Sequence, residues 1–308
     1  MEYLMYYLVY GLLYLLSLMP LWLLYGISNA IYGLIYYVFG YRKKVVMDNL
    51  RHAFPEKTEG ELVSIAKKFY LNFVDSFMET LKLFSAGPEM IKRRMQFDNP
   101  EIFEQFYSQN RSCQVHLGHN FNWELGNLAV PLVIQYKFLV VYMPLANKTF
   151  DQIFKNFRTR TGTILISATE MSRSMIPYRH SKYLLCLAAD QAPGSPARAY
   201  WLNFFGRPTP MVKGPERAAK LGDIPAVFGK IYKTKRGYYH AKFELISDRP
   251  SSLQEGELTR RYVKLLEDAI RKDPDMWLWS HRRWKHPWKE EYKASWIDEG
   301  PLPDSKGQ

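Results

Sequence analysis

Residues 112–127, SCQVHLGHNFNWELGN, carry the clearest structural signal in the chain. They begin with a short apolar run, residues 113–117, which ends at Gly118 and gives way to a helix-like pattern. An apolar run that ends at glycine before a helical segment predicts a strand, a tight turn and a helix. Sites in open α/β sheets are usually built where strands end, so we expect a functional site at this turn.

Two titratable residues frame the predicted turn. His119 directly follows the glycine, and Glu124 lies five positions further on, beside Trp123. Within one helix these side chains would point about 140° apart, but a histidine on the turn can meet a glutamate one turn into the helix. A neighbouring carboxylate fixes the imidazole tautomer, and the helix N-terminus disfavours the charged ring. The pair therefore predicts a general base for a hydroxyl, and a capping histidine without chemistry is the alternative.

Composition narrows the classes of partner. The chain has 308 residues, enough for a large core, and a net charge of +12 that predicts an acidic partner such as anionic lipid, phosphate, nucleic acid or an acidic protein. Aromatic residues make up 16% of the chain, which suits a membrane interface as well as an ordinary core. Cys113 and Cys186 both lie in apolar runs, so we interpret them as buried thiols rather than a disulfide or a zinc site.

The N-terminal segment predicts a membrane anchor. No charged residue occurs between Tyr3 and Tyr41, and Pro20 divides this stretch into two apolar segments near the lower length limit for a bilayer core of about 30 Å. Residues 42–44 are basic, which favours a cytoplasmic location for the rest of the chain. We expect an uncleaved anchor at residues 1–41 and one cytoplasmic domain at residues 42–308. One bent spanning helix, a hairpin and two helices in one leaflet all fit the anchor, and a buried helix pair in a soluble domain is the alternative.

After residue 97 the sequence alternates between short apolar runs and helical segments. The predicted strands are residues 113–117, 138–142, 163–166, 183–188 and 226–231. The predicted helices between most of them are residues 123–135, 149–160, 170–178 and 213–221. This alternation predicts an α/β fold with a mixed, mainly parallel sheet flanked by helices. Residues 238–246 are expected to add an antiparallel strand, residues 256–272 an amphipathic helix, and the tail from Trp288 is expected to fray.

Further polar residues near the ends of these elements are candidates for substrate binding. Arg158 and Arg160 stand two positions apart at a helix end, so only one is expected to face the site. A guanidinium could bind phosphate or a developing oxyanion, and a solvated basic helix end is the alternative. Asp190 and Gln191 follow a predicted strand before a turn, and Asn122 lies within the predicted strand–turn–helix stretch.

Three other motifs have less specific interpretations. Residues 277–285, WLWSHRRWK, mix aromatic and basic side chains, which fits a membrane interface, an acidic partner or, last, nucleic acid. Residues 204–208, FFGRP, could wall an acyl chain or form a surface turn. His116 forms His-x-x-His with His119, but no third metal ligand is apparent, so we favour a structural role for it.

Several of these motifs, in this order, resemble the bacterial lipid A biosynthesis acyltransferases of the lauroyl/myristoyl type, within the lysophospholipid acyltransferase superfamily. The resemblance runs through the apolar N-terminus, RKKVVMDNLRHAFPEKTEGE, GHNFNWE, VYMPLANK, FRTRTG, ADQAPG, FFGRPTP, KGPERAA and WLWSHRRWK. It implies a glycerolipid acyltransferase-like sheet behind a membrane anchor, at the cytoplasmic face of the bacterial inner membrane. It also implies transfer of a fatty acyl group from acyl carrier protein or coenzyme A to a lipid hydroxyl, with no metal or prosthetic group.

Carried over by position, the resemblance assigns His119 and Glu124 as the catalytic pair and Arg158 or Arg160 as the basic residue. The chain departs from many relatives at Phe121, where they have glycine, so the acyl-chain length and the acceptor stay open. The acceptor could be a lipid A precursor, a lysophospholipid or an amino-acid lipid. Two alternative functions compete with acyl transfer: a non-catalytic protein that binds anionic lipid, and an esterase with the same catalytic pair. The chain lacks the Gly-x-Ser-x-Gly motif of many esterases, which counts against the second.

Overall fold

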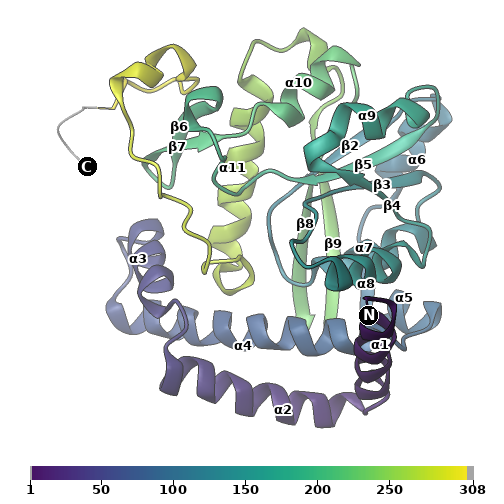
Figure 1. Ribbon diagram of the computed structural model, residues 1–308. Helices are drawn as coiled ribbons and strands as arrows, with labels where there is room; N and C mark the ends of the chain where they lie inside the picture. The colour runs from purple at the N-terminus through teal and green to yellow at the C-terminus, as the bar shows by residue number, and fades with distance from the viewer. Residues whose placement is uncertain (1, 304–308) are drawn as a thin grey trace.

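A computed structural model describes residues 2–303 (Figure 1). Its centre is a seven-stranded sheet in the order β1-β9-β8-β2-β5-β3-β4. The strands are β1 (Met95–Phe97), β2 (Cys113–Leu117), β3 (Lys137–Tyr142), β4 (Ile164–Ser167), β5 (Tyr183–Ala188), β8 (Ala226–Lys235) and β9 (Tyr238–Ser247). Strands β8, β2, β5, β3 and β4 are parallel, and β9 runs antiparallel to β8. The prediction of a mixed, mainly parallel sheet is confirmed.

Helices cover both faces of this sheet. They are α5 (Pro88–Arg94), α6 (Glu101–Ser108), α7 (Trp123–Ala129), α8 (Lys148–Thr159), α9 (Met171–Met175), α10 (Gly214–Leu221) and α11 (Glu257–Lys272). The alternation of side chains along β2 separates the two faces. His116 packs edge-on against Tyr262 of α11, whereas Val115 and Leu117 line a cavity together with residues of α7. The strand–turn–helix prediction at residues 112–127 therefore holds, with α7 shorter than expected.

A two-stranded hairpin, β6 (Tyr200–Phe204) with β7 (Arg207–Met211), was not predicted from the sequence. Pro208 and Pro210 lie inside β7 and made the segment look like a loop, because proline cannot donate to a strand ladder. Phe204 and Phe205 are buried against Trp284 and do not line the cavity beneath α7, so their interpretation as an acyl-chain wall is wrong.

The N-terminal helices lie along one end of the molecule, at the bottom of the view in Figure 1. They are α1 (Glu2–Ser17), α2 (Leu21–Gly33), which continues as a π-helical segment Leu34–Phe39, α3 (Lys43–Ala53) and α4 (Glu59–Leu83). Figure 1 shows α2 side by side with α4, and α1 turned away from α2 at the Pro20 break. Among the described residues, Leu21–Phe39 is the one helix long and apolar enough to cross a membrane by length and composition.

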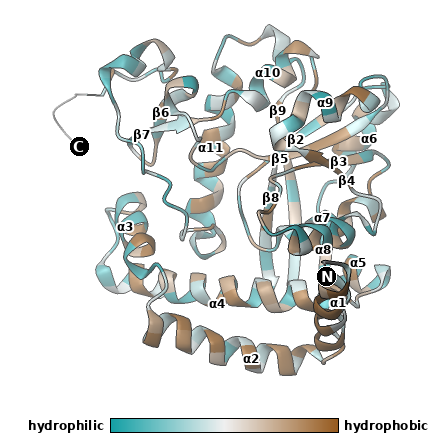
Figure 2. Ribbon diagram, viewed as in Figure 1, coloured by the Kyte–Doolittle hydropathy of each residue, from teal (hydrophilic) through white to brown (hydrophobic). Residues whose placement is uncertain are grey.

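The surface of these first two helices is strongly apolar. Figure 2 shows α1 and α2 in the hydrophobic colours, and large exposed side chains on them include Leu8, Trp22, Tyr37 and Phe39. This face is consistent with the predicted membrane anchoring, because soluble proteins rarely leave so much contiguous apolar surface in water. The opposite face of α2 packs on α4, so the anchor is part of the folded body in this structure.

The C-terminal region is packed, which corrects two expectations. Trp288 and Tyr292 are buried against Trp201, at ring-centroid distances of 5.3 and 4.8 Å, so the described part of the tail does not fray there. Trp277 and Trp279, in the segment of residues 277–285, are also buried. The aromatic side chains in that segment belong chiefly to the core, and the interpretation of the whole segment as an interface is wrong.

Candidate active site

His119 and Asp190 form the centre of the site, at the ends of neighbouring parallel strands. His119 lies on the turn after β2, and Asp190 follows β5, which pairs with β2 in register from Cys113 to Leu117. The Asp190 carboxylate accepts hydrogen bonds from the backbone N–H of His119 (2.8 Å) and from Nε1 of Trp277 (2.6 Å), and Nδ1 of His119 lies 2.5 Å from Oδ1. Three fixed partners therefore hold this carboxylate against the ring.

The charges of the pair support each other. Burial raises the pKa of Asp190, but the charge of His119 and the three hydrogen bonds outweigh it and bring the pKa to about 2. Burial has the opposite effect on His119 and lowers its pKa, but the charge and the hydrogen bond of Asp190 outweigh burial, so the net pKa is raised above the usual 6.5. Because the carboxylate is ionised, Nδ1 carries the proton, and Nε2 of the neutral ring is left as the base.

The structure corrects the predicted contact between His119 and Glu124. The carboxylate of Glu124 faces Arg158, whose Nε lies 3.1 and 3.0 Å from its two oxygens and whose Nη2 also donates to it. Nε1 of Trp123 approaches Glu124 as well, at 3.3 Å. A guanidinium matches a carboxylate with two parallel hydrogen bonds, and Asp190 already occupies the ring nitrogen that Glu124 was expected to hold. A catalytic role for Glu124 stays a prediction, through Arg158 rather than through the imidazole.

Arg158 is the arginine of the predicted pair that faces the site. Burial lowers the pKa of its guanidinium, but the hydrogen bonds and charge of Glu124 outweigh it, so the net pKa is raised. Nε and Nη2 bind Glu124, which leaves Nη1 for a substrate oxygen. Arg160 turns away, donates to the carbonyl of Phe84 at 3.3 Å and lies over the ring of Phe157. The two arginines diverge as their spacing predicted.

A cavity of about 340 Å³ opens beside these residues. His119, Glu124 and Arg158 line one part of it, together with Tyr142 at the end of β3 and Met143 directly after it. The rest is lined mainly by apolar side chains from the face of the sheet under α7, which include Val115, Phe138, Leu184, Cys186 and Phe243. A base that lines a mainly apolar cavity can activate a hydroxyl against an electrophile on a long alkyl chain.

The other predicted site residues have structural surroundings. Asn122 caps α7 by accepting from the N–H of Leu125 (3.3 Å) and donates to Glu79 (3.0 Å). Gln191 is half-buried beside Asp190 but is not among the residues that line the cavity. Among residues 2–303, no group of three His, Cys, Asp or Glu side chains could hold a metal ion.

His116 and Phe121 both point away from the cavity. His116 is buried and lies 3.0 Å from the Gln114 side-chain amide, and burial lowers its pKa to about 4. Phe121 is buried against Phe69 and Phe73 of α4, and its N–H donates to the carbonyl of Met276 (3.0 Å). The Phe121 amide is therefore engaged within the protein, and its side chain leaves the substrate path open.

Asp190 as the partner of His119 was missed because the order of strands was unknown. The sequence marked Asp190 as a residue at a strand end, but only the pairing of β2 with β5 brings it to the ring. Trp277 had no signal beyond the aromatic segment that contains it. Both residues lie far from His119 in sequence, and no local pattern couples them.

Comparisons with known proteins identify the family of the chain. The family model described as bacterial lipid A biosynthesis acyltransferase matches residues 1–286. The chain is similar to the lipid A biosynthesis myristoyltransferase of Escherichia coli (strain K12), at 24% identity over 158 residues, 51% of this chain and 48% of that protein. It is similar to the lipid A biosynthesis acyltransferase 1 of Shigella flexneri over the same shares, also at 24% identity. The match spans about half the length of these curated relatives.

Proposed function

Since the chain belongs to the family of bacterial lipid A biosynthesis acyltransferases, we propose that it transfers a fatty acyl group from a thioester to a hydroxyl of a lipid. The acceptor we propose is a lipid A precursor, and the donor is acyl carrier protein or coenzyme A carrying the acyl chain. The observation that carries this proposal is that His119, paired with Asp190, lines a mainly apolar cavity. The cavity supplies the room for an acyl chain, and the pair supplies the base.

The proposed reaction needs only groups of the protein. Nε2 of His119 takes the proton from the acceptor hydroxyl while Asp190 stabilises the imidazolium that forms. The acceptor oxygen then attacks the thioester carbonyl, and Nη1 of Arg158 stabilises the negative charge on the carbonyl oxygen or binds an acceptor phosphate. When the carbon–sulfur bond breaks, His119 returns the proton to the leaving thiolate, so that an ester and a free thiol result.

The location and partners that we propose are based on the net charge of the chain and on the exposed apolar side chains of its first two helices. A net charge of +12 suits both anionic lipid and an acidic acyl carrier protein. The exposed apolar side chains of α1 and α2 suit insertion into a bilayer, and the basic residues 42–44 suit the cytoplasmic face of the inner membrane. The site then lies on the side where thioester donors occur. The proposed chemistry requires no metal or prosthetic group.

The test is transfer of a labelled acyl chain over a panel of acceptors that includes a lipid A precursor, lysophospholipids and amino-acid lipids. His119→Ala should lower transfer by roughly 10²–10⁴-fold, the usual worth of a general base. The matched control is His116→Gln, which keeps a hydrogen-bonding side chain beside Gln114 and should retain most activity. Hydrolysis of the donor without any acylated lipid would identify an esterase instead. Normal transfer by His119→Ala would contradict the proposed mechanism.

A further inference from the structure

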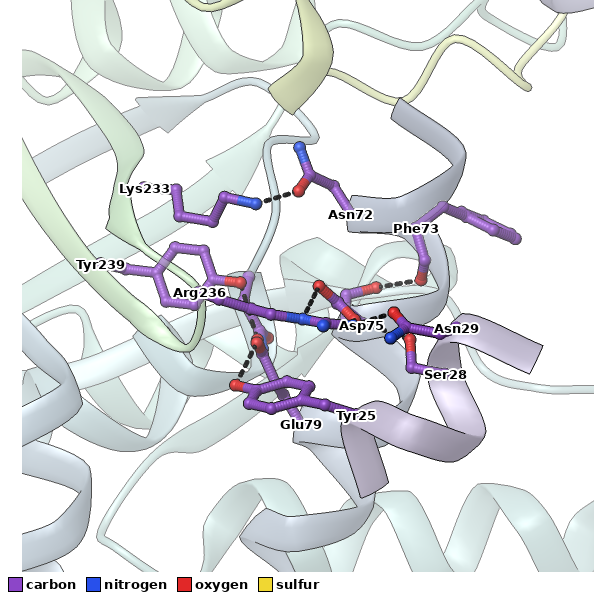
Figure 3. A network of polar contacts seen from close by, with 12 residues as sticks. Tyr25, Ser28, Asn29, Asn72, Phe73, Asp75, Glu79, Lys233, Arg236 and Tyr239 are labelled. Carbon is purple, nitrogen blue, oxygen red and sulfur yellow. Dashed lines mark hydrogen bonds and ion pairs between the residues drawn. The ribbon is translucent and has the colours of Figure 1, made fainter. Parts of the chain in front are cut away.

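Glu79 is a buried carboxylate that the proposed chemistry does not use. It lies on α4, 6% exposed, and accepts three hydrogen bonds from three different parts of the chain. Figure 3 shows the two that come from Tyr25 and Tyr239. Tyr25 of α2 donates to Oε1 (3.0 Å), while Tyr239 of β9 and Asn122 donate to Oε2 (2.7 and 3.0 Å). A buried carboxylate with several donors is a fixed point, because any displacement leaves a polar group without a partner.

One of these three bonds leads directly to the site. Asn122 is the cap of α7, so its Oδ1 accepts from the first turn of the helix while its Nδ2 is held by Glu79. Glu124 is two residues further along this turn and binds Arg158. A connected series of hydrogen bonds and one helical turn thus joins α4 to the guanidinium that faces the cavity. Capping uses only the oxygen of Asn122, so the Nδ2 bond is an additional contact that ties the start of α7 to α4.

A second buried carboxylate, one turn earlier on α4, makes similar contacts but does not reach the site. Asp75 accepts from Ser28 of α2 (2.6 Å) and from Nε and Nη2 of Arg236 in the β8–β9 turn (2.8 and 2.5 Å). It is 1% exposed. Figure 3 shows both carboxylates between α2 and the β8–β9 segment that carries Arg236 and Tyr239. Asp75 therefore provides a comparison on the same helix, also buried and also bound to α2 and to the β8–β9 segment, but without a bond to Asn122.

We propose that Glu79 is a positioning residue for acyl transfer, which holds Asn122 and thereby sets where α7 presents Glu124 and Arg158 to the substrate. This proposal rests on the acyl transfer proposed above. Through Tyr25 the same carboxylate also ties the site to α2, whose far side exposes Trp22. The apolar anchor helix and the catalytic helix thus share one buried contact point.

The chemistry of the contact predicts which substitutions matter. Glu79→Met keeps the volume but removes both oxygens, so Nδ2 of Asn122 loses its acceptor. Glu79→Gln can keep one oxygen between Asn122 and Tyr239 and turn its amide nitrogen toward the hydroxyl oxygen of Tyr25. We therefore expect kcat to fall about 10- to 100-fold in Glu79→Met, the worth of a buried donor left without its acceptor, and only severalfold in Glu79→Gln. KM for the acyl donor should change less than kcat, because Glu79 itself does not line the cavity and the apolar side chains from the sheet keep their places.

The experiment uses the full chain in lipid bilayers and reads two quantities. The first is hydrogen exchange of the backbone amides of residues 122–127, which needs no substrate. The second is kcat and KM for transfer. Asn122→Ser, which keeps the cap but cannot reach Glu79, approaches the same contact from the other side. Asp75→Leu is the matched control, because it removes a buried carboxylate that binds α2 and the β8–β9 turn but does not contact Asn122.

The proposal predicts faster exchange at residues 122–127 and lower kcat in Glu79→Met and Asn122→Ser, with near-normal values in Glu79→Gln. The double variant Glu79→Met with Asn122→Ser should be little worse than the worse single variant, because both substitutions remove the same contact between Glu79 and Asn122. Asp75→Leu should lower the melting temperature without faster exchange at α7. Unchanged exchange in Asn122→Ser, fully additive kcat losses, or equal α7 exchange in Asp75→Leu would overturn it. If no acceptor is acylated by the wild type, the proposed function fails, and the exchange data still decide whether Glu79 holds α7.

Discussion

Replacing Asp190 with asparagine tests the centre of the site, because it changes one atom in a carboxylate with three partners. The backbone N–H of His119 and Nε1 of Trp277 both donate to Oδ2, whereas Oδ1 faces Nδ1 of the ring. An asparagine keeps both donors satisfied only if its oxygen takes the Oδ2 position. Its NH2 group then faces Nδ1, which must accept. The ring proton moves to Nε2, and the nitrogen that should act as the base is blocked.

The alternative orientation of the introduced asparagine keeps the productive tautomer at a cost that can be worked out. Its oxygen would accept from Nδ1, but the NH2 group would face two N–H donors. Each buried donor without an acceptor costs about 1–3 kcal/mol, so the productive arrangement lies about 2–6 kcal/mol higher. Tenfold in rate corresponds to roughly 1.4 kcal/mol, so transfer should fall by a factor between roughly 30 and roughly 10⁴.

The assay is single-turnover acyl transfer by Asp190→Asn and by the double variant with Trp277→Phe, each checked by thermal melting. Removing the indole N–H takes away one of the two donors that oppose the productive orientation. The double variant should therefore recover about tenfold over Asp190→Asn, although Trp277→Phe alone should be slightly slower than wild type. Activity of Asp190→Asn within threefold of wild type, or a double variant slower than both singles, would refute the argument.

Four further results are expected. Transfer should increase as the pH rises through the pKa of His119, which is raised above its usual 6.5, because the base must be neutral. The stability that the imidazolium gains from Asp190 is complete below pH 6.5, so the melting temperature should fall over the same rise in pH. Glu124→Gln should cost about 2 kcal/mol in thermal unfolding through the unpaired Arg158, but leave the midpoint of the pH–rate profile unchanged. Removing residues 1–40 should release protein from membranes in fractionation and lower its melting temperature, and full-length protein that is a soluble monomer without detergent would contradict the anchor. Phe138→Leu should enlarge the cavity. In a competition between acyl donors of different chain length, this variant should prefer longer chains than the wild type does.

Local patterns predicted the elements of this fold well, because strand and helix periodicity are read from neighbouring residues. The strands at residues 113–117 and 183–188 match β2 and β5 at both ends. The hairpin of β6 and β7 escaped because its prolines lie on a two-stranded ribbon, where few ladder hydrogen bonds are at stake. The buried tail escaped for another reason. Trp288 finds its partner Trp201 far away in sequence, and a polar composition does not reveal such a contact.

The site residues also divide into those that local patterns predict and those that depend on the order of strands. His119 was found from its turn, and the choice between Arg158 and Arg160 was limited by helix geometry to one of them. Which carboxylate meets the imidazole was not a local question, because it depends on β5 lying next to β2.

The two acids differ in the fixed donors available to each. Asp190 has a backbone N–H and an indole that fix it at the ring, whereas Glu124 meets a guanidinium that offers two parallel bonds. Each carboxylate thus contacts the cation whose geometry it matches. The five-residue spacing then places Glu124 beside Arg158, which lines the cavity, instead of behind the ring of His119. In the proposed reaction, one turn and the helix after it would thus supply the base and hold the arginine that stabilises the oxyanion.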